Sequence, residues 1–179
     1  MTRVMRRILL LRHAKSDWSD PAASDHARPL NRRGQDAARR IGAYLDRHRL
    51  VPEYVLCSTA IRARETWDLV AAEIPAAPPP RYDERLYNAA AGSILDVLGQ
   101  ASPGIKSLLL VGHNPGLQEL STLLIASGDL DDRERLHEKL PAGGLVVIDF
   151  PIEAWSRLHP RSGRLERFVV PRTLAAATD

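Results

Sequence analysis

Arginine and histidine recur just after apolar segments of this chain, where the chain leaves a predicted core. Two of them follow the run Ile8–Leu11, one follows Leu108–Val111, and one comes shortly after Tyr54–Cys57. They are Arg12, His13, His113 and Arg62. Guanidinium groups pair with phosphate oxygens through two parallel hydrogen bonds, and a neutral imidazole is a competent nucleophile. If these side chains converge, they predict a site that holds a phosphoryl group and attacks it.

The elements that must position them are short apolar runs, typical of strands buried on both faces. The runs are Ile8–Leu11, Tyr54–Cys57, Leu108–Val111, Leu145–Phe150 and Phe168–Val170. Helical spacing of apolar residues predicts helices over residues 30–50, 60–73, 93–98 and 115–127. This alternation predicts a three-layer α/β/α sandwich around a mostly parallel sheet. Since ligands bind beyond the carboxyl ends of such strands, the residues that follow the strands should gather at one edge.

The ends of the predicted helices are marked by particular residues. Asn31 is predicted to cap the first helix and Asn114 the last, and Gly128 is predicted to end the last one. Residues 128–144 are polar and rich in charge. We expect them to form an exposed, partly helical excursion before a late strand.

The composition is that of an ordinary globular protein, with 44% hydrophobic and 26% charged residues among 179. No linker divides the chain, so residues 1–179 are expected to form a single domain, with a peripheral tail after Pro171. No apolar stretch approaches the roughly 18 residues of a membrane span. The run Ile8–Leu11 is also too short for a signal peptide. We therefore expect a cytoplasmic protein that has no membrane partner.

Charge, aromatic content and the supply of cysteine and carboxylate residues argue against a nucleic-acid partner, a disulfide and a metal site. The net charge is +3, but the basic residues are scattered among acids and only 5% of residues are aromatic, so a nucleic-acid partner is not expected. The single Cys57 rules out an internal disulfide. No carboxylate or thiolate cluster accompanies the histidines, so no metal site is expected. The sequence leaves the oligomeric state open.

Three motifs, taken in order, resemble the histidine phosphatase superfamily. They are Arg12-His13, Ser58-x-x-x-Arg62-Ala63-x-x-Thr66 and Gly112-His113-Asn114. The segments "LLLRHAKSDW", "RPLNRRG", "LCSTAIRARET" and "LLLVGHNPGLQEL" are most similar to its compact bacterial branch, which is related to the phosphohistidine phosphatase SixA. The resemblance runs from about residue 8 to residue 124 and implies a phosphoglycerate mutase-like fold.

The resemblance also implies a role for each of the four residues. His13 would attack phosphorus and become a phosphohistidine intermediate, while Arg12, Arg62 and His113 would hold the phosphoryl oxygens. Water would then hydrolyse the intermediate, with no metal and no cofactor. The implied substrate is a phosphorylated protein, above all one that carries phosphohistidine, or a small phosphorylated molecule. The chain is short for this superfamily, so little would cover the site, which suits a phosphorylated side chain on a protein surface.

The group that protonates the leaving group is not fixed by these motifs. Glu84 lies in a segment similar to the mutase pattern and is a possible general acid, and Asp83 is the other candidate. A nitrogen leaving group needs less general-acid help than an alkoxide, so members of the SixA branch can lack this acid. A phosphomonoesterase or mutase that acts on a small metabolite is therefore an alternative. A phosphoryl-binding module without turnover is another.

Several neighbouring residues have both a functional and a structural interpretation. Asn114 could bind phosphate as well as cap a helix, and Lys15 could either extend the positive site or lie in an exposed loop. Asp25 and Arg28 are expected to form an ion pair that closes a loop. Arg64 does not match the motif, and we expect it to be a solvated helix residue.

Overall fold

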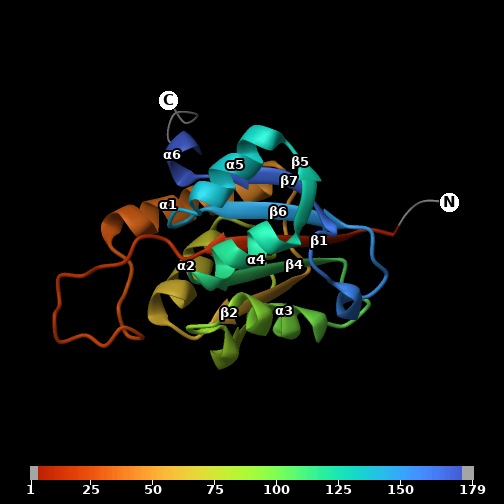
Figure 1. Ribbon diagram of the computed structural model, residues 1–179. Helices are drawn as coiled ribbons and strands as arrows, with labels where there is room; N and C mark the ends of the chain where they lie inside the picture. Colours follow the sequence, from red (N-terminus) through yellow and green to blue (C-terminus); the bar gives the residue numbers. More distant parts are fainter. Residues whose placement is uncertain (1–3, 175–179) are drawn as a thin grey trace.

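A seven-stranded sheet forms the centre of the computed structural model, which describes residues 4–174 (Figure 1). The strand order is β3-β2-β4-β1-β6-β7-β5. The strands are β1 (Arg6–Arg12), β2 (Tyr54–Ser58), β3 (Pro80–Asp83), β4 (Ser107–Gly112), β5 (Ile125–Gly128), β6 (Leu145–Phe150) and β7 (Gly163–Val169). The pairs β1–β4, β2–β3, β2–β4 and β5–β7 are parallel, whereas β1–β6 and β6–β7 are antiparallel. The prediction of a mostly parallel sheet is confirmed.

Helices cover both faces of this sheet. They are α1 (Arg32–Arg47), α2 (Ile61–Ala72), α3 (Ala91–Gly99), α4 (Gly116–Leu124), α5 (Leu130–Glu138) and α6 (Pro171–Leu174), with short 3-10 turns η1 (Glu84–Leu86) and η2 (Trp155–Arg157). Among these described helices, none is long and apolar enough to cross a membrane. The rest of the tail that we expected to be peripheral, residues 175–179, lies outside the described residues.

The central strand β1 shows why its apolar run is continuous. Ile8 and Leu10 pack in a core cluster that includes residues of α3 and α4, whereas Leu9 and Leu11 pack in a second cluster with residues of α1 and α2. Each of the four is at most 1% exposed. Side chains alternate between the faces of a strand, so a strand covered on both sides must be apolar at every position. The three-layer α/β/α architecture is thereby confirmed.

The start of α1 fixes the loop that follows β1. As predicted, Asn31 is the N-cap, and its side chain accepts a hydrogen bond from Gly34 N–H over 2.8 Å. The N–H of Asn31 donates to the carbonyl of Lys15 over 3.0 Å. A Cβ at Gly34 would lie 2.1 Å from that carbonyl oxygen, so only glycine allows the loop to approach the helix this closely. The N-terminus of α1 therefore holds this loop close to the helix through the Lys15 carbonyl.

Two predictions about α4 are wrong. The helix begins at Gly116 with Pro115 as its N-cap. Asn114 makes no cap, since its Oδ1 accepts no hydrogen bond within the described chain and its Nδ2 donates to the carbonyl of Leu140. The helix also ends at Leu124, since residues 125–128 form β5 and pair in parallel with β7. Gly128 is thus the end of a strand. Pairing with a strand some 35 residues later overrides local helix propensity, and that contact is invisible to the spacing of apolar residues.

Residues 128–144 are partly helical, as predicted, but they are less peripheral than expected. Asp129 caps α5 by accepting from the N–H of Asp132 over 2.9 Å. Leu136 and Leu140 are buried in the core cluster on the α3–α4 side of the sheet. The segment that follows α5 returns to the carboxyl end of β1, where the N–H of Gly143 lies 3.1 Å from the carbonyl of Arg12.

Candidate active site

Two histidines meet where the adjacent parallel strands β1 and β4 end. Arg12 pairs with Gly112 at the ends of the two strands, and the residue after each is a histidine, His13 and His113. The N–H of His13 donates to the carbonyl of Gly112 over 3.0 Å. The centres of the two imidazole rings lie 5.1 Å apart. The register of two neighbouring strands is therefore what brings these side chains together.

The ring of His13 has a defined tautomer. Its Nδ1 lies 2.7 Å from the carbonyl oxygen of Ala14, and because a carbonyl only accepts, we assign the proton to Nδ1. Nε2 then carries the free lone pair, and the Nε–H of Arg62 approaches it at 3.4 Å. The N–H of Ala14 donates in turn to Thr66 Oγ1 over 3.0 Å. These contacts hold the ring in place and leave Nε2 as its nucleophilic atom.

Arg62 lies in the first turn of α2, is 5% exposed and binds the loop between β1 and α1. Its Nη1 and Nη2 donate to the backbone carbonyl and the carboxylate of Asp25, over 2.6 and 3.1 Å. The same carboxylate accepts from Arg28 over 2.8 Å and from the hydroxyl of Tyr87. The hydrogen bond from Tyr87, followed by that from Arg28, holds the pKa of Asp25 well below its usual range. The expected pair of Asp25 and Arg28 is present, but its carboxylate also orders Arg62.

Arg12 and Asn114 share one backbone acceptor from the segment after α5. Arg12 Nη1 donates to the carbonyl of Leu140 over 3.0 Å, and Asn114 Nδ2 donates to the same oxygen over 2.8 Å. Burial, and secondly the charge of Arg62, lower the pKa of Arg12 from its ordinary value. Sequence reasoning missed the part played by Leu140, because a backbone carbonyl leaves no signal in residue types.

His113 is anchored by Ser58 at the end of β2, with 2.7 Å between Nε2 and the serine Oγ. Ser58 is fully buried. Within residues 4–174, the Nδ1 of His113 and the Nε of Arg12 are buried and have no hydrogen-bond partner. Both are nitrogen atoms of residues that border the same cavity, and both have hydrogen-bonding capacity left for a ligand.

A cavity of about 730 Å³ lies above the strand ends. It is lined by Arg12, His13, Lys15, Ser16, Trp18, Asp25, Arg28, Asn31, Arg62, Tyr87, Asn88, His113, Asn114 and Ala142. Four of these residues are arginine or lysine, against one carboxylate, which is itself paired with two of the arginines. The cavity is therefore suited to an anion whose oxygens accept several hydrogen bonds.

Both histidines of the cavity are held neutral. Burial lowers the pKa of His13 to about 4, with the charges of Arg62, Arg12 and Arg28 acting in the same direction. Burial, followed by the neighbouring His13 and Arg62, lowers the pKa of His113 to about 3. At neutral pH Nε2 of His13 is therefore unprotonated, and its lone pair can attack an electrophile such as phosphorus.

We expect the two rings to titrate far below the ordinary histidine value near 6.5. In an NMR titration of the free protein, the ring protons of His13 and His113 should shift near pH 4 and pH 3. In the unfolded chain both titrate near 6.5, so it binds more protons than the folded state between about pH 4 and 6.5. The free energy of unfolding should therefore fall as the pH drops through that window. Titration of either ring near pH 6.5 would contradict this assignment.

Glu84 and Asp83 are placed differently from the four residues above. Glu84 is the first residue of η1, is exposed, and is not among the described residues that line the cavity. Asp83 binds Arg85 over 2.7 Å. The same segment instead presents Tyr87 and Asn88 to the cavity. Tyr87 came within the motif that suggested Glu84, but only the turn geometry decides which of these side chains faces inward.

Of Arg64 and Lys15, only Lys15 lines the cavity at the strand ends. The Nε of Arg64 donates to the carbonyl of Thr59 over 2.9 Å, and its guanidinium lies 4.0 Å from the centre of the Tyr82 ring. It is absent from the described lining of the cavity, whereas Lys15 belongs to that lining. Arg64 is thus a natural control for Arg62, two residues away in the same helix.

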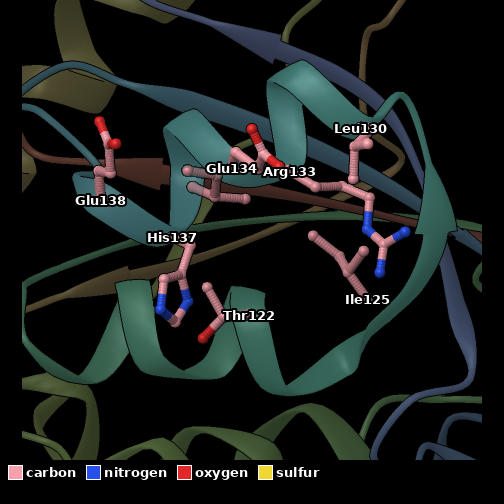
Figure 2. A pocket seen from close by; sticks show the side chains of 8 residues that line it. Thr122, Ile125, Leu130, Arg133, Glu134, His137 and Glu138 are labelled. Carbon is pink, nitrogen blue, oxygen red and sulfur yellow. The ribbon is translucent and has the colours of Figure 1, made fainter.

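A smaller cavity of about 400 Å³ lies between α4 and α5, near β5 (Figure 2). His137 of α5 points toward Thr122 of α4, and Glu134 and Glu138 also belong to the lining. Its charges are mixed, with Arg133 the one arginine or lysine among the lining residues. This composition does not match the anion-binding character of the cavity at the strand ends.

Comparison with known proteins connects this geometry to a family. The sequence model of the histidine phosphatase superfamily (branch 1) matches residues 8–101. An uncharacterized protein of Mycobacterium tuberculosis (strain H37Rv) is 38% identical over 164 residues, which cover 90% of this chain and all of that protein.

Two solved structures share the fold over nearly their whole length. One is the SixA protein of Nakamurella multipartitia, assigned as a phosphohistidine phosphatase, with 28% identity and a TM-score of 0.81 over 93% of this chain and 96% of that one. The other, with the same assignment, is SixA of Agrobacterium tumefaciens, with 29% identity and a TM-score of 0.78 over 93% and 98%. The chain is a phosphatase, and it belongs to the histidine phosphatase superfamily, branch 1.

Proposed function

We propose that this phosphatase hydrolyses the phosphorus–nitrogen bond of phosphohistidine on a protein. In the first step, Nε2 of His13 attacks phosphorus and displaces the imidazole of the substrate, which takes a proton from solvent. In the second step, water attacks the phosphohistidine formed on His13 and releases inorganic phosphate. Arg12, Arg62 and His113 bind the phosphoryl oxygens and stabilise the charge that builds on them in each transition state.

The nucleophile is supported by the geometry around His13. Its Nδ1 is tied to the Ala14 carbonyl, its Nε2 faces Arg62, and its depressed pKa keeps it unprotonated at neutral pH. A phosphoryl group held by Arg62 would thus lie next to the lone pair that attacks it. Asn114 is also proposed to contact the phosphoryl group through its Nδ2 donor, since it lines the cavity and this nitrogen shares the Leu140 carbonyl with Arg12.

The choice of a nitrogen leaving group rests on one observation, the carboxylates at the cavity. Among the described residues that line it, the sole carboxylate is Asp25, whose pKa is lowered by Tyr87 and Arg28. An ionised carboxylate cannot protonate an alkoxide, and Glu84 is not in the lining. Phosphate esters need such an acid more than phosphohistidine does. Hydrolysis of phosphohistidine is therefore the reaction that this set of side chains favours.

The test is a comparison of substrates. We expect the protein to hydrolyse a phosphohistidine-bearing carrier protein with kcat/KM at least about 100-fold above any phosphate ester in a panel, since general-acid help is worth about that much or more. Excess chelator should leave the rate unchanged. Chelator-sensitive turnover would overturn the mechanism, and faster hydrolysis of an ester would overturn the substrate class. The absence of any turnover would favour the phosphoryl-binding module.

The variant Glu84→Gln is the matched control for the general acid. Phosphohistidine turnover should be unchanged in this variant, because the side chain is exposed and is not among the described residues that line the cavity. A loss of ester turnover with phosphohistidine turnover retained would assign Glu84 to a side activity on esters. A loss of phosphohistidine turnover would place Glu84 in the main reaction and contradict the proposal.

A further inference from the structure

Trp18 is a large apolar side chain that is exposed to solvent at the candidate active site. It is 76% exposed, whereas the other two tryptophans, Trp67 and Trp155, are at most 1% exposed. Among the large hydrophobic side chains of residues 4–174 it is the most exposed. It also borders the cavity that contains His13 and Arg62. An indole left in water beside a binding cavity is available to a ligand.

The indole is held in place from one side. The guanidinium of Arg28 lies 3.5 Å from the centre of the ring. Arg28 is only 7% exposed and is itself fixed, because it donates to Ser16 Oγ and to Asp25 Oδ1, the latter over 2.8 Å. A cation stacked on one face orients an indole. The high exposure of Trp18 then leaves the remainder of its surface for a second planar group.

We propose that Trp18 is a specificity-determining residue that stacks on the planar imidazole ring from which the phosphoryl group is transferred. The inference rests on the proposed function and deepens it. In-line displacement puts the leaving ring on the side of phosphorus opposite the attacking His13 Nε2, and Trp18 lines the same cavity as His13 and Arg62. Aromatic stacking stabilises a bound planar ring and contributes little to the binding of a substrate without one.

The kinetic test uses two small substrates that share the phosphorus–nitrogen bond. Phosphoimidazole has the ring, and phosphoramidate lacks it. In Trp18→Ala, we expect kcat/KM to fall about tenfold for phosphoimidazole, which equals about 1.4 kcal/mol, and to change less than about twofold for phosphoramidate. Trp18→Phe should retain most of the preference. Trp18→Leu, which is apolar but not aromatic, should behave like Trp18→Ala.

We call the stacking surface of Trp18 the platform. Three kinetic outcomes would overturn the proposal that it stacks on the leaving ring. They are equal losses on both small substrates, no loss on either, and a leucine variant as good as the phenylalanine one. A loss with the phosphorylated carrier protein alone, and none with phosphoimidazole, would also overturn it. That result would make Trp18 a contact for the surface of the partner protein instead.

A fluorescence measurement tests the stacking role of Trp18 independently of the proposed function. Since Trp18 is the exposed tryptophan, its emission can be followed while phosphoimidazole is added to His13→Asn, which should bind the ligand without hydrolysing it. We expect quenching by phosphoimidazole and none by saturating inorganic phosphate. Quenching without hydrolysis by the wild type would refute the proposed function and leave the platform standing. Hydrolysis by the wild type without quenching in the variant would refute the platform alone.

Discussion

Replacement of His13 by alanine should reduce turnover by about 10⁴-fold or more, the order of loss seen when an enzyme loses its nucleophile. The variant lacks Nε2, and we do not expect the other histidine of the cavity to replace it, because the Nε2 of His113 lies 2.7 Å from Ser58 Oγ and its Nδ1 is left to bind a phosphoryl oxygen. The measurement is the single-turnover rate with a phosphohistidine-bearing protein. Rapid acid-free quenching with radiolabelled substrate should also trap a labelled phosphoenzyme in the wild type and none in the variant.

The control for this variant is anion binding. The phosphate ligands Arg12 and Arg62 are unchanged in His13→Ala, so binding of inorganic phosphate should persist within about tenfold, and the thermal unfolding midpoint should show that the fold is intact. Persistent binding together with lost turnover would separate chemistry from recognition. Turnover within about tenfold of the wild type would rule out His13 as the nucleophile.

Replacement of Arg62 by alanine should lower kcat/KM by about 10²- to 10³-fold, the usual cost of removing one donor to a charged transition state. The guanidinium faces His13 Nε2 and is held by two hydrogen bonds to Asp25, so it is already oriented before a phosphoryl group arrives. Arg62→Lys keeps the charge but not the planar fork, and we expect an intermediate loss. Steady-state kinetics on phosphohistidine measures both variants.

Arg64→Ala is the matched control, because it removes the same side chain two residues later in α2. Its guanidinium is stacked on Tyr82, outside the described lining of the cavity, so kcat/KM should stay within about twofold of the wild type. Equal losses in the two alanine variants would mean that helix stability, and not phosphate binding, explains the effect of Arg62.

The fold was readable from the sequence wherever burial on both faces left an uninterrupted apolar run. The run Ile8–Leu11 predicted β1 because a central strand needs apolar side chains on both sides. Strand β5 was missed for the opposite reason. Its Ala126 and Ser127 are exposed, and the strand exists through pairing with β7 at the edge of the sheet. An edge strand with exposed residues has no apolar pattern by which to recognise it.

The sequence by itself determined which side chains would meet at the strand ends. Arg12 ends β1, and His13 and His113 follow two parallel neighbours, whose carboxyl ends meet at one edge of the sheet. The presence of Arg62 at the first turn of a helix that follows β2 placed it at the same edge. Covalent order and strand direction are sufficient to place these side chains at one edge, whereas the pairing of β1 with β4 makes the two histidines neighbours.

Only the tertiary structure decided how those side chains are held and what else surrounds them. The carboxylate of Asp25, the hydroxyl of Tyr87 and the carbonyl of Leu140 reach the site from three different loops. Their positions depend on contacts between segments far apart in the chain, such as the hydrogen bond of Gly143 N–H to the Arg12 carbonyl. Such contacts follow from the packing of the whole chain, so local residue types and their spacing do not predict them.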